Sequence, residues 1–359
     1  MTCGKKSAKR ALFSFFLAIV VFSPLVVHSE TQGTKESTNI AAVPDAIQAD
    51  TLPTKDSNAQ TLSLAAGGTS SDPSSSLNSL MQIKSNFVGS ATYGVPIEVP
   101  PGRGGIAPNL ALLYNSQAGN GWLGVGWLLD MGAIQRSTRF GVNYNSNDFV
   151  ATANGSSTDL VARGEWGSNY YGAKIEGAFL KYYLNASTGG WEVTAKNGTK
   201  YFYGSSASSR QDNASVVFKW CLDKVQDTNG NYMMVSYVKD FGEIYLSRID
   251  YTGNQSLPPT NYVVFHRALR SDAPAMYVPN FSVKTRYRLK TIEVGASGQM
   301  VRAYKLIYTA SVSTSRSILT SVRQYGSDSS VDESGNVTGG SVLPSTSLSA
   351  AVHKYDDVS

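Results

Sequence analysis

The chain has 359 residues, with 31 basic and 26 acidic side chains and two cysteines, Cys3 and Cys221. This length allows one large β domain or two ordinary domains. With one cysteine in a predicted leader, the mature chain excludes an intrachain disulfide, and Cys221 is expected to be a buried, inert thiol.

Residues 1–29 have the pattern of an export signal, with four basic residues before an apolar run at 11–27 and expected cleavage after Ser29. The alternative, a single membrane anchor, is less favoured because the run is short for a span of about 20 residues and contains Pro24. Removing four basic residues leaves 27 basic against 26 acidic residues. That balance gives no electrostatic reason to expect nucleic acid as a partner. The signal predicts a secreted or extracellular protein.

Residues 30–84 are rich in serine, threonine, alanine, aspartate and glutamine and poor in large apolar side chains. Such a segment buries too little apolar area to offset the entropy of ordering it. We therefore predict a disordered linker between the signal and the domain that follows.

Residues 85–326 show apolar side chains with a period of two, which predicts β-strands. Asn197-Gly198 lies between two such runs and predicts a hairpin in which both turn residues have positive φ. Turn signals recur at 187–190, 227–231 and 252–254, while 128–131 suggests at most a short helical turn. The expected fold is all-β, an antiparallel sheet rich in hairpins. Strands are expected at 95–99, 110–114, 179–184, 191–195, 199–203, 216–225, 232–238, 244–251, 262–268, 287–294, 301–308 and 318–325.

The stretch 91–141 is the most specific part of the sequence, because its glycines, prolines and tryptophans suit strands separated by tight turns. It resembles the opening of the SpvB-type virulence-plasmid B protein family, the N-terminal domain of insecticidal toxin complex B subunits and Rhs-type toxins. The resemblance extends over 86–348. Its structural motif residues here are Gly94, Pro96, Pro100, Pro101, Gly102, Arg103, Gly104, Tyr114, Asn115, Gly121, Trp122, Gly124, Gly126 and Trp127.

Two phosphate-binding interpretations of this stretch fail on their context. Gly119, Gly121 and Gly124 match a dinucleotide-binding pattern, but Gly126 would weaken the helix that must follow, and no acidic residue occurs at 135–144. The turn at 100–105 lacks the Lys-Ser/Thr pair of a P-loop. We expect a rigid turn there, with Arg103 bracing a carbonyl or carboxylate.

Catalytic, metal and cofactor sites are not indicated. After the signal, the histidines are His266, in a predicted strand, and His353, near the end, and neither accompanies a cysteine or serine pattern. Some members of the family carry an ADP-ribosyltransferase domain with Ser-Thr-Ser and Glu-x-Glu elements. Ser313-Thr314-Ser315 is present as an expected hairpin loop, but Glu-x-Glu is absent from the sequence. We predict a protein that is not an enzyme and that uses no cofactor.

The resemblance implies a secreted, non-catalytic module that forms part of a β-rich shell enclosing or delivering a toxin. It also implies toxin-complex or Rhs subunits as partners, with membrane contact only through them; family members are also found in the cytoplasm. Residues 327–359 are expected to be a polar loop and a truncated tail, so that the sheet keeps an open edge. Three interpretations fit this expectation: a shortened member of the family, the front piece of a split gene product, or a remnant.

A second class of function remains an alternative. Exposed tyrosine and tryptophan rings can stack on sugars, as in an adhesin or a carbohydrate-binding β domain.

Overall fold

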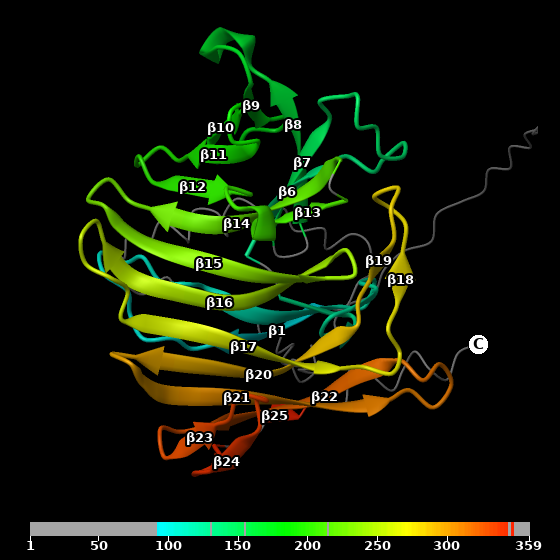
Figure 1. The fold of residues 1–359 in the computed structure, drawn as a ribbon, viewed down its shortest axis with the longest axis vertical. Helices are drawn as coiled ribbons and strands as arrows, with labels where there is room; N and C mark the ends of the chain where they lie inside the picture. Colours follow the sequence, from blue (N-terminus) through cyan, green and yellow to red (C-terminus); the bar gives the residue numbers. More distant parts are fainter. Residues whose placement is uncertain (1–91, 130, 154–155, 214, 344–345, 348–359) are drawn as a thin grey trace, which may run out of the picture. The chain divides into compact units, whose positions relative to one another are not determined.

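The structure is a computed structural model that describes residues 92–129, 131–153, 156–213, 215–343 and 346–347, all within one compact unit, Ala65–Ser359. The predicted signal and linker lie outside these residues. The described elements are β-strands, apart from the short 3-10 helices η1 (Gly164–Trp166) and η2 (Ala207–Ser209) (Figure 1). All strand pairs between these elements are antiparallel, which confirms the predicted fold class. None of the helices in the described part is long and apolar enough to cross a membrane.

One part of the largest sheet closes on itself. Eight strands pair in sequence around a ring, because the last, β14, pairs with both β12 and β6. Closure removes the free edges that an open sheet of the same strands would expose. The ring consists of β6 (Ala133–Arg136), β7 (Phe149–Ala153), β8 (Ser156–Ala162), β9 (Tyr170–Ala173), β10 (Lys181–Asn185), β11 (Gly190–Thr194), β12 (Lys200–Tyr203) and β14 (Val217–Gln226).

Strand β14 belongs to both the ring and an open sheet. Its residues Lys219–Cys221 pair with β6, whereas Lys224–Gln226 pair with the next strand, β15. The short strand β13 (Arg210–Asp212) pairs with the first part of β14. From β14 the sheet continues as an antiparallel meander of β15 (Asn231–Asp240), β16 (Glu243–Asn254), β17 (Asn261–Leu269), β20 (Tyr287–Ala296), β21 (Gln299–Ala310), β22 (Ser317–Tyr325) and β25 (Thr346–Ser347).

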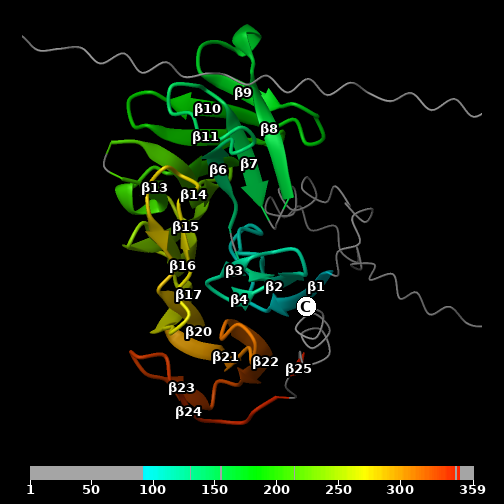
Figure 2. The same cartoon turned by 90° about the vertical axis from the view of Figure 1, so that its right-hand side faces the viewer.

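The N-terminal strands form a second layer on this open sheet. Figure 2 shows β1 (Thr92–Ile97) to β4 (Gly124–Val125) on one face of β16–β22. β2 (Leu110–Asn115) pairs with β1 and with β5 (Trp127–Leu128), and β3 (Asn120–Gly121) pairs with β4. The fully buried Leu112 and Leu123 of this layer share a core with Ile249, Val263 and Ile292 of the sheet.

Three hairpin turns share one geometry. At 195–199, the Ala195 N–H donates to the Thr199 carbonyl at 2.9 Å and the Gly198 N–H donates to the Ala195 carbonyl at 2.9 Å. Equivalent bonds close 227–231 and 332–336, and the fourth residue is glycine each time, with φ of +80°, +81° and +73°. The predicted hairpin at Asn197-Gly198 is therefore confirmed. However, the turn is longer than expected, and only Gly198 of the pair has positive φ.

The structure also differs from the expected elements. Residues 127–128 form β5, so the helical turn suggested for 128–131 is wrong in the residues described, because Trp127 and Leu128 pair with Tyr114 and Leu113. Strands β6–β9 were not predicted. Within 327–347, β23 (Ser329–Val331) and β24 (Val337–Gly339) form a hairpin, and Ser321 and Val322 pair with β25. The loop after β17 contains the small hairpin of β18 (Ala275–Met276) and β19 (Val283–Lys284).

Aromatic side chains fill the ring. Phe149 lies 4.9 Å from Trp191 and 5.8 Å from Trp220 between ring centroids, and Tyr171 lies 5.2 Å from Trp191. The steep interplanar angles, 62° to 81° for these pairs, place ring edges against ring faces, which aromatic quadrupoles favour. This cluster explains why so small a ring is stable without a disulfide.

Trp191 is 1% exposed, so Trp191→Ala should leave a large cavity and lower the free energy of unfolding by about 3–5 kcal/mol. Phe140→Ala is the matched control because Phe140 is 95% exposed, and its effect should stay within about 0.5 kcal/mol. Urea unfolding followed by tryptophan fluorescence and circular dichroism measures both. Equal midpoints would contradict the proposed core.

Candidate functional site

The motif residues lie in the N-terminal layer and in the turns that attach it to the open sheet. They form two anchor points at opposite ends of β17, together with an aromatic stack. Gly94 and Pro96 lie on the exposed side of β1. The remaining twelve residues lie in the anchors or in the stack.

The first anchor is the turn at 100–105. The Tyr251 hydroxyl donates to the Pro100 carbonyl at 3.0 Å, and the Asn261 side-chain amide donates to the Pro101 carbonyl at 3.4 Å. A β-carbon on Gly102 would lie 1.8 Å from the Ile106 carbonyl oxygen, so only glycine fits there. The chain therefore turns sharply enough to lie against the start of β17.

Arg103 of this turn donates from Nε to the Thr252 carbonyl at 3.1 Å. Thr252 has φ of +76°, which is costly for a β-branched residue, and its hydroxyl contacts the Tyr251 carbonyl and accepts from the Thr260 N–H at 3.0 Å. Gly104 packs against Asn231 and Asp227, which belong to one of the three shared turns. Arg103 thus helps to hold a strained point of β16.

The second anchor is the β3–β4 hairpin. Gly124 has φ of +86°, and a β-carbon there would lie 2.4 Å from the Ser317 carbonyl oxygen. Trp122 contacts other strands of the open sheet. Its carbonyl accepts from the Leu289 N–H at 2.9 Å, and its ring lies 6.2 Å from that of Tyr245. Gly124, the last glycine of the dinucleotide pattern, therefore allows close approach of two backbones.

A buried arginine fixes this hairpin. The Arg270 side chain has 0% exposure and donates to Asp272 from Nε at 2.8 Å and from a terminal nitrogen at 2.6 Å. Its other donors reach the Gly121 carbonyl at 2.5 Å and the Asn120 side-chain oxygen at 2.6 Å. Asp272 also accepts from the Ser317 N–H at 2.5 Å and from the Ser317 hydroxyl at 2.8 Å. We call Arg270, Asp272, Asn120, Gly121 and Ser317 the clamp.

The clamp changes the acidity of Asp272. Burial alone raises the pKa of this carboxyl group, but the hydrogen bonds from Arg270, Ser317 and Asn120 favour the ionised form more strongly. The pKa of Asp272 therefore lies well below its ordinary value. The carboxylate remains charged at every ordinary pH, which a fully buried guanidinium requires.

Tyr114, Asn115, Gly126 and Trp127 form the end of the N-terminal layer. The Tyr114 and Trp127 rings are 5.4 Å apart, and Gly126 lies directly under Tyr114, where a β-carbon would come within 2.4 Å of the ring. The Asn115 N–H donates to the Gly126 carbonyl at 2.8 Å. This arrangement positions the backbone; it presents no nucleophile or acid–base pair.

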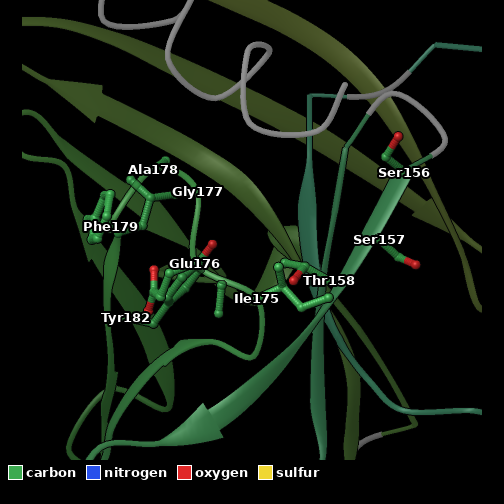
Figure 3. Close-up of a pocket in the computed structure, with 11 residues that line it drawn as sticks. Ser156, Ser157, Thr158, Ile175, Glu176, Gly177, Ala178, Phe179 and Tyr182 are labelled. Carbon is green, nitrogen blue, oxygen red and sulfur yellow. The ribbon is translucent and has the colours of Figure 1, made fainter. Parts of the chain in front are cut away.

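A separate pocket opens in the wall of the ring. Figure 3 shows its two sides: the start of β8, with Ser156 to Thr158, and the segment with Glu176 to Phe179. Its volume is about 190 Å³, and Leu180 and Tyr182 lie at its buried side. Sequence reasoning missed this pocket, because residues 149–173, which include one of its sides, were not assigned to strands. The apolar residues Ile175 and Phe179 in the segment between strands were the sequence signal that could have indicated it.

His266, Glu293 and Cys221 are packed or hydrogen-bonded within the sheet. The His266 Nε2 and the Glu293 carboxylate are 2.9 Å apart, and the Tyr262 hydroxyl donates to Glu293 at 3.0 Å. The hydrogen bond from His266, together with that from Tyr262, holds the pKa of Glu293 below its usual value against the effect of burial. Gly335 packs on His266. Cys221 is buried. The described residues contain no group of three or more His, Cys, Asp or Glu side chains placed to hold a metal.

Comparison with known proteins agrees with this geometry. The family described as Salmonella virulence plasmid 65kDa B protein matches residues 85–256. Mono(ADP-ribosyl)transferase SpvB of Salmonella choleraesuis is 29% identical over 195 residues, which are 47% of this chain and 32% of that protein. The Salmonella typhimurium protein of the same name is 28% identical over the same length. The chain spans about a third of the length of these relatives.

Two solved structures share the fold. The complex TcdB2-TccC3-Cdc42 superposes with a TM-score of 0.57 at 21% identity, over 72% of this chain and 16% of that chain. The N-terminal domain of effector protein SpvB from Salmonella typhimurium superposes with a TM-score of 0.53 at 19% identity, over 65% of this chain and 98% of that chain.

The chain thus shares its fold with part of the TcdB2-TccC3-Cdc42 complex and with the N-terminal domain of effector protein SpvB. The resemblance seen in the sequence is confirmed, because residues 85–256 match this family model and the fold superposes on the N-terminal domain of SpvB.

Gly124→Ala should lower the free energy of unfolding by more than the roughly 1–2 kcal/mol of a left-handed non-glycine residue, because the new methyl group also meets the Ser317 carbonyl. Gly119→Ala is the control, since nothing lies within 4 Å of a β-carbon there. Chemical denaturation of the two variants should separate them clearly. Similar losses for both would show that β4 is not packed on β22 as described.

Asp272→Asn should lower the free energy of unfolding at neutral pH by about 3–5 kcal/mol, because it leaves Arg270 buried without a carboxylate. The folded-state pKa of Asp272 is below the unfolded value of about 3.9, so the stabilisation is fully present above that value and is lost as the pH falls through the folded-state pKa.

Urea unfolding from pH 7 to pH 2 tests this pH dependence. The gap between wild type and variant should be constant above about pH 5 and narrow below about pH 4. Asp148→Asn, at an exposed position, should follow the wild type throughout. A gap that does not change with pH would contradict a role for the ionised carboxylate.

Proposed function

We propose that this protein is a secreted, non-catalytic structural module that contributes part of a β-rich shell around a toxin, with a partner chain supplying the rest. The observation that supports it most is the superposition on a toxin-complex structure, which covers 72% of this chain but only 16% of the larger one. Because the domain corresponds to a small share of a much larger chain, it is suited to forming one part of a shell.

The edge of the open sheet supports the same proposal. Among the described residues, β22 pairs along its whole length with β21. On its other side, Ser321 and Val322 pair with β25, Tyr325 bridges to Val342, and the Leu343 N–H donates to the Gln324 carbonyl at 3.0 Å. Val342 and Leu343 are 52% and 45% exposed beside this edge. Unpaired strand edges with nearby apolar side chains favour pairing with another chain.

The absence of a catalytic role is part of the proposal. The named relatives are ADP-ribosyltransferases, but the solved structure of SpvB that this chain matches is an N-terminal domain, and the alignment with the whole protein covers 32% of it. The anchors, the clamp and the aromatic stack hold backbone in place. We propose that catalysis in such relatives belongs to other parts of their chains, and that export follows the predicted signal.

Purification of the tagged chain from the exported fraction of its source cells, after mild crosslinking, tests the proposal. We expect a complex larger than the chain, in which mass spectrometry finds crosslinks between β22 and a protein with toxin-complex B or Rhs sequence. Amides of β22 that face away from β21 should exchange with deuterium quickly in the isolated chain and slowly in the complex. A monomer in which these outward-facing β22 amides are already protected would overturn the proposal.

A further inference from the structure

The ring of eight strands is closed unevenly. β8 pairs with β7 along Ser156–Leu160, but it pairs with β9 only along Leu160–Ala162. The last backbone bond on that side runs from the Lys174 N–H to the Asp159 carbonyl at 2.8 Å. Beyond it, no described strand pairs with the β9-facing side of β8. The wall of the ring therefore has an opening beside residues 156–158, and the pocket of Figure 3 occupies it.

The backbone at this opening offers a donor and an acceptor. In an antiparallel strand, alternate residues direct their N–H and C=O groups to the same edge. The Arg163 N–H bonds to Tyr170 and the Asp159 carbonyl accepts from Lys174, so odd-numbered residues of β8 face the β9 side. Both backbone groups of Ser157, an exposed residue, thus face the opening. They are placed to pair with an added strand.

The pocket next to Ser157 suits one apolar side chain. Leu180 and Tyr182, 5% and 3% exposed, lie at its buried side, while Ile175 and Phe179, 74% and 56% exposed, lie at its rim. Its volume of about 190 Å³ is below the range of roughly 300–1,000 Å³ typical of sites for drug-sized molecules. An incoming side chain would cover apolar surface that the ring leaves open to water.

The segment 174–180 contains a strained backbone residue and a buried polar atom that lacks a hydrogen-bond partner in the described part of the chain. Phe179 has φ of +56°, a conformation that bulky residues rarely adopt, although its ring is half exposed. Glu176 Oε2 is buried and has no hydrogen-bond partner among the described residues, while Oε1 has only a 3.4 Å contact with Arg163. Strain and unsatisfied polar groups concentrate where a protein binds something. Both occur here within four residues.

The charge around the rim indicates the flanking chemistry of the occupant. Lys174 and Lys196 are exposed, and the Lys196 ammonium lies 3.8 Å from the centre of the Phe179 ring. Lys174 has Asp159 as an ion-pair partner at 4.0 Å, and the Glu176 carboxylate in the pocket is partly offset by Arg163. The excess positive charge at the rim favours acidic residues in the partner.

A sugar fits less well than a peptide. A pyranose stacks on a free aromatic face, whereas one face of Phe179, the exposed aromatic ring of this pocket, carries Lys196, even though serine, threonine and glutamate side chains also line the pocket. A peptide needs only paired backbone groups and a space for alternate side chains. The free edge at Ser157 supplies the first, and the pocket supplies the second.

We propose that this opening binds an extended acidic peptide, which adds a strand to β8 at Ser157 and inserts one large apolar side chain between Ile175 and Phe179. The site lies in the ring and involves neither β22 nor the proposed shell contact. It can therefore function whether or not the chain joins a shell.

Fluorescence anisotropy of the full chain with labelled nonapeptides tests the proposal. The probe has leucine at its centre with alternating threonine and glutamate on either side. We expect saturable binding that weakens more than about tenfold when the leucine becomes serine, when the glutamates become lysines, or when alternate backbone amides are N-methylated. Deuterium uptake at the Ser157 amide should slow in the complex.

Variants of the protein locate the site. Ile175→Asp should weaken binding by more than about tenfold without changing the thermal unfolding midpoint, since Ile175 is exposed. Val312→Asp is the matched control, because Val312 is 103% exposed in the turn between β21 and β22. No binding of the leucine peptide, equal binding of the N-methylated peptide, or competition by simple pyranosides instead of peptide would each overturn the proposal.

Discussion

The buried ion pair between Arg270 and Asp272 is the interaction on which the rest of the described structure depends. A guanidinium with no exposed surface is stabilised only if almost all of its donors find acceptors, and here they do so through one carboxylate, one amide and one backbone carbonyl. Because those acceptors belong to the β3–β4 hairpin and to the loop after β17, satisfying the charge also positions the two layers. Ser317 adds the start of β22 to the same group.

The second constraint is backbone proximity at the other end of β17. There the turn at 100–105 presents carbonyl groups to Tyr251 and Asn261, and glycine is required because Gly102 leaves no room for a side chain. The clamp at one end of β17 and the turn at 100–105 at the other end therefore hold the N-terminal layer along the nine residues of this strand. The motif thus holds two layers of backbone together, an arrangement that suits the proposed role in a shell.

The sequence predicted the parts of this fold that local chemistry determines. Two turns predicted hairpins, namely Asn197-Gly198 and the Asp-Thr-Asn-Gly-Asn sequence at 227–231. They did so because few residue types adopt a positive φ at a fixed turn position. The clamp could not be predicted, since Asn120, Arg270 and Ser317 meet only after the meander has brought distant strands together. Strands β6–β9 were missed because β6 and β9 are only four residues long and β8 begins with Ser-Ser-Thr-Asp, so that apolar alternation is short or weak. The pocket in the ring wall was missed for the same reason.

The two parts of the large sheet manage their edges in opposite ways. The ring closes on itself and fills with tryptophan, tyrosine and phenylalanine, so that its stability is internal. Among the described residues, the open sheet continues past β22 only with the two residues of β25, and its further pairing there belongs to the proposed shell contact. β14 joins the two, because its first half pairs with β6 and its second half pairs with β12 on one edge, which closes the ring, and with β15 on the other, which starts the meander. Because β14 is shared, one continuous strand joins the two parts of the sheet, while the first residues of β8 keep an edge that faces the opening in the ring wall.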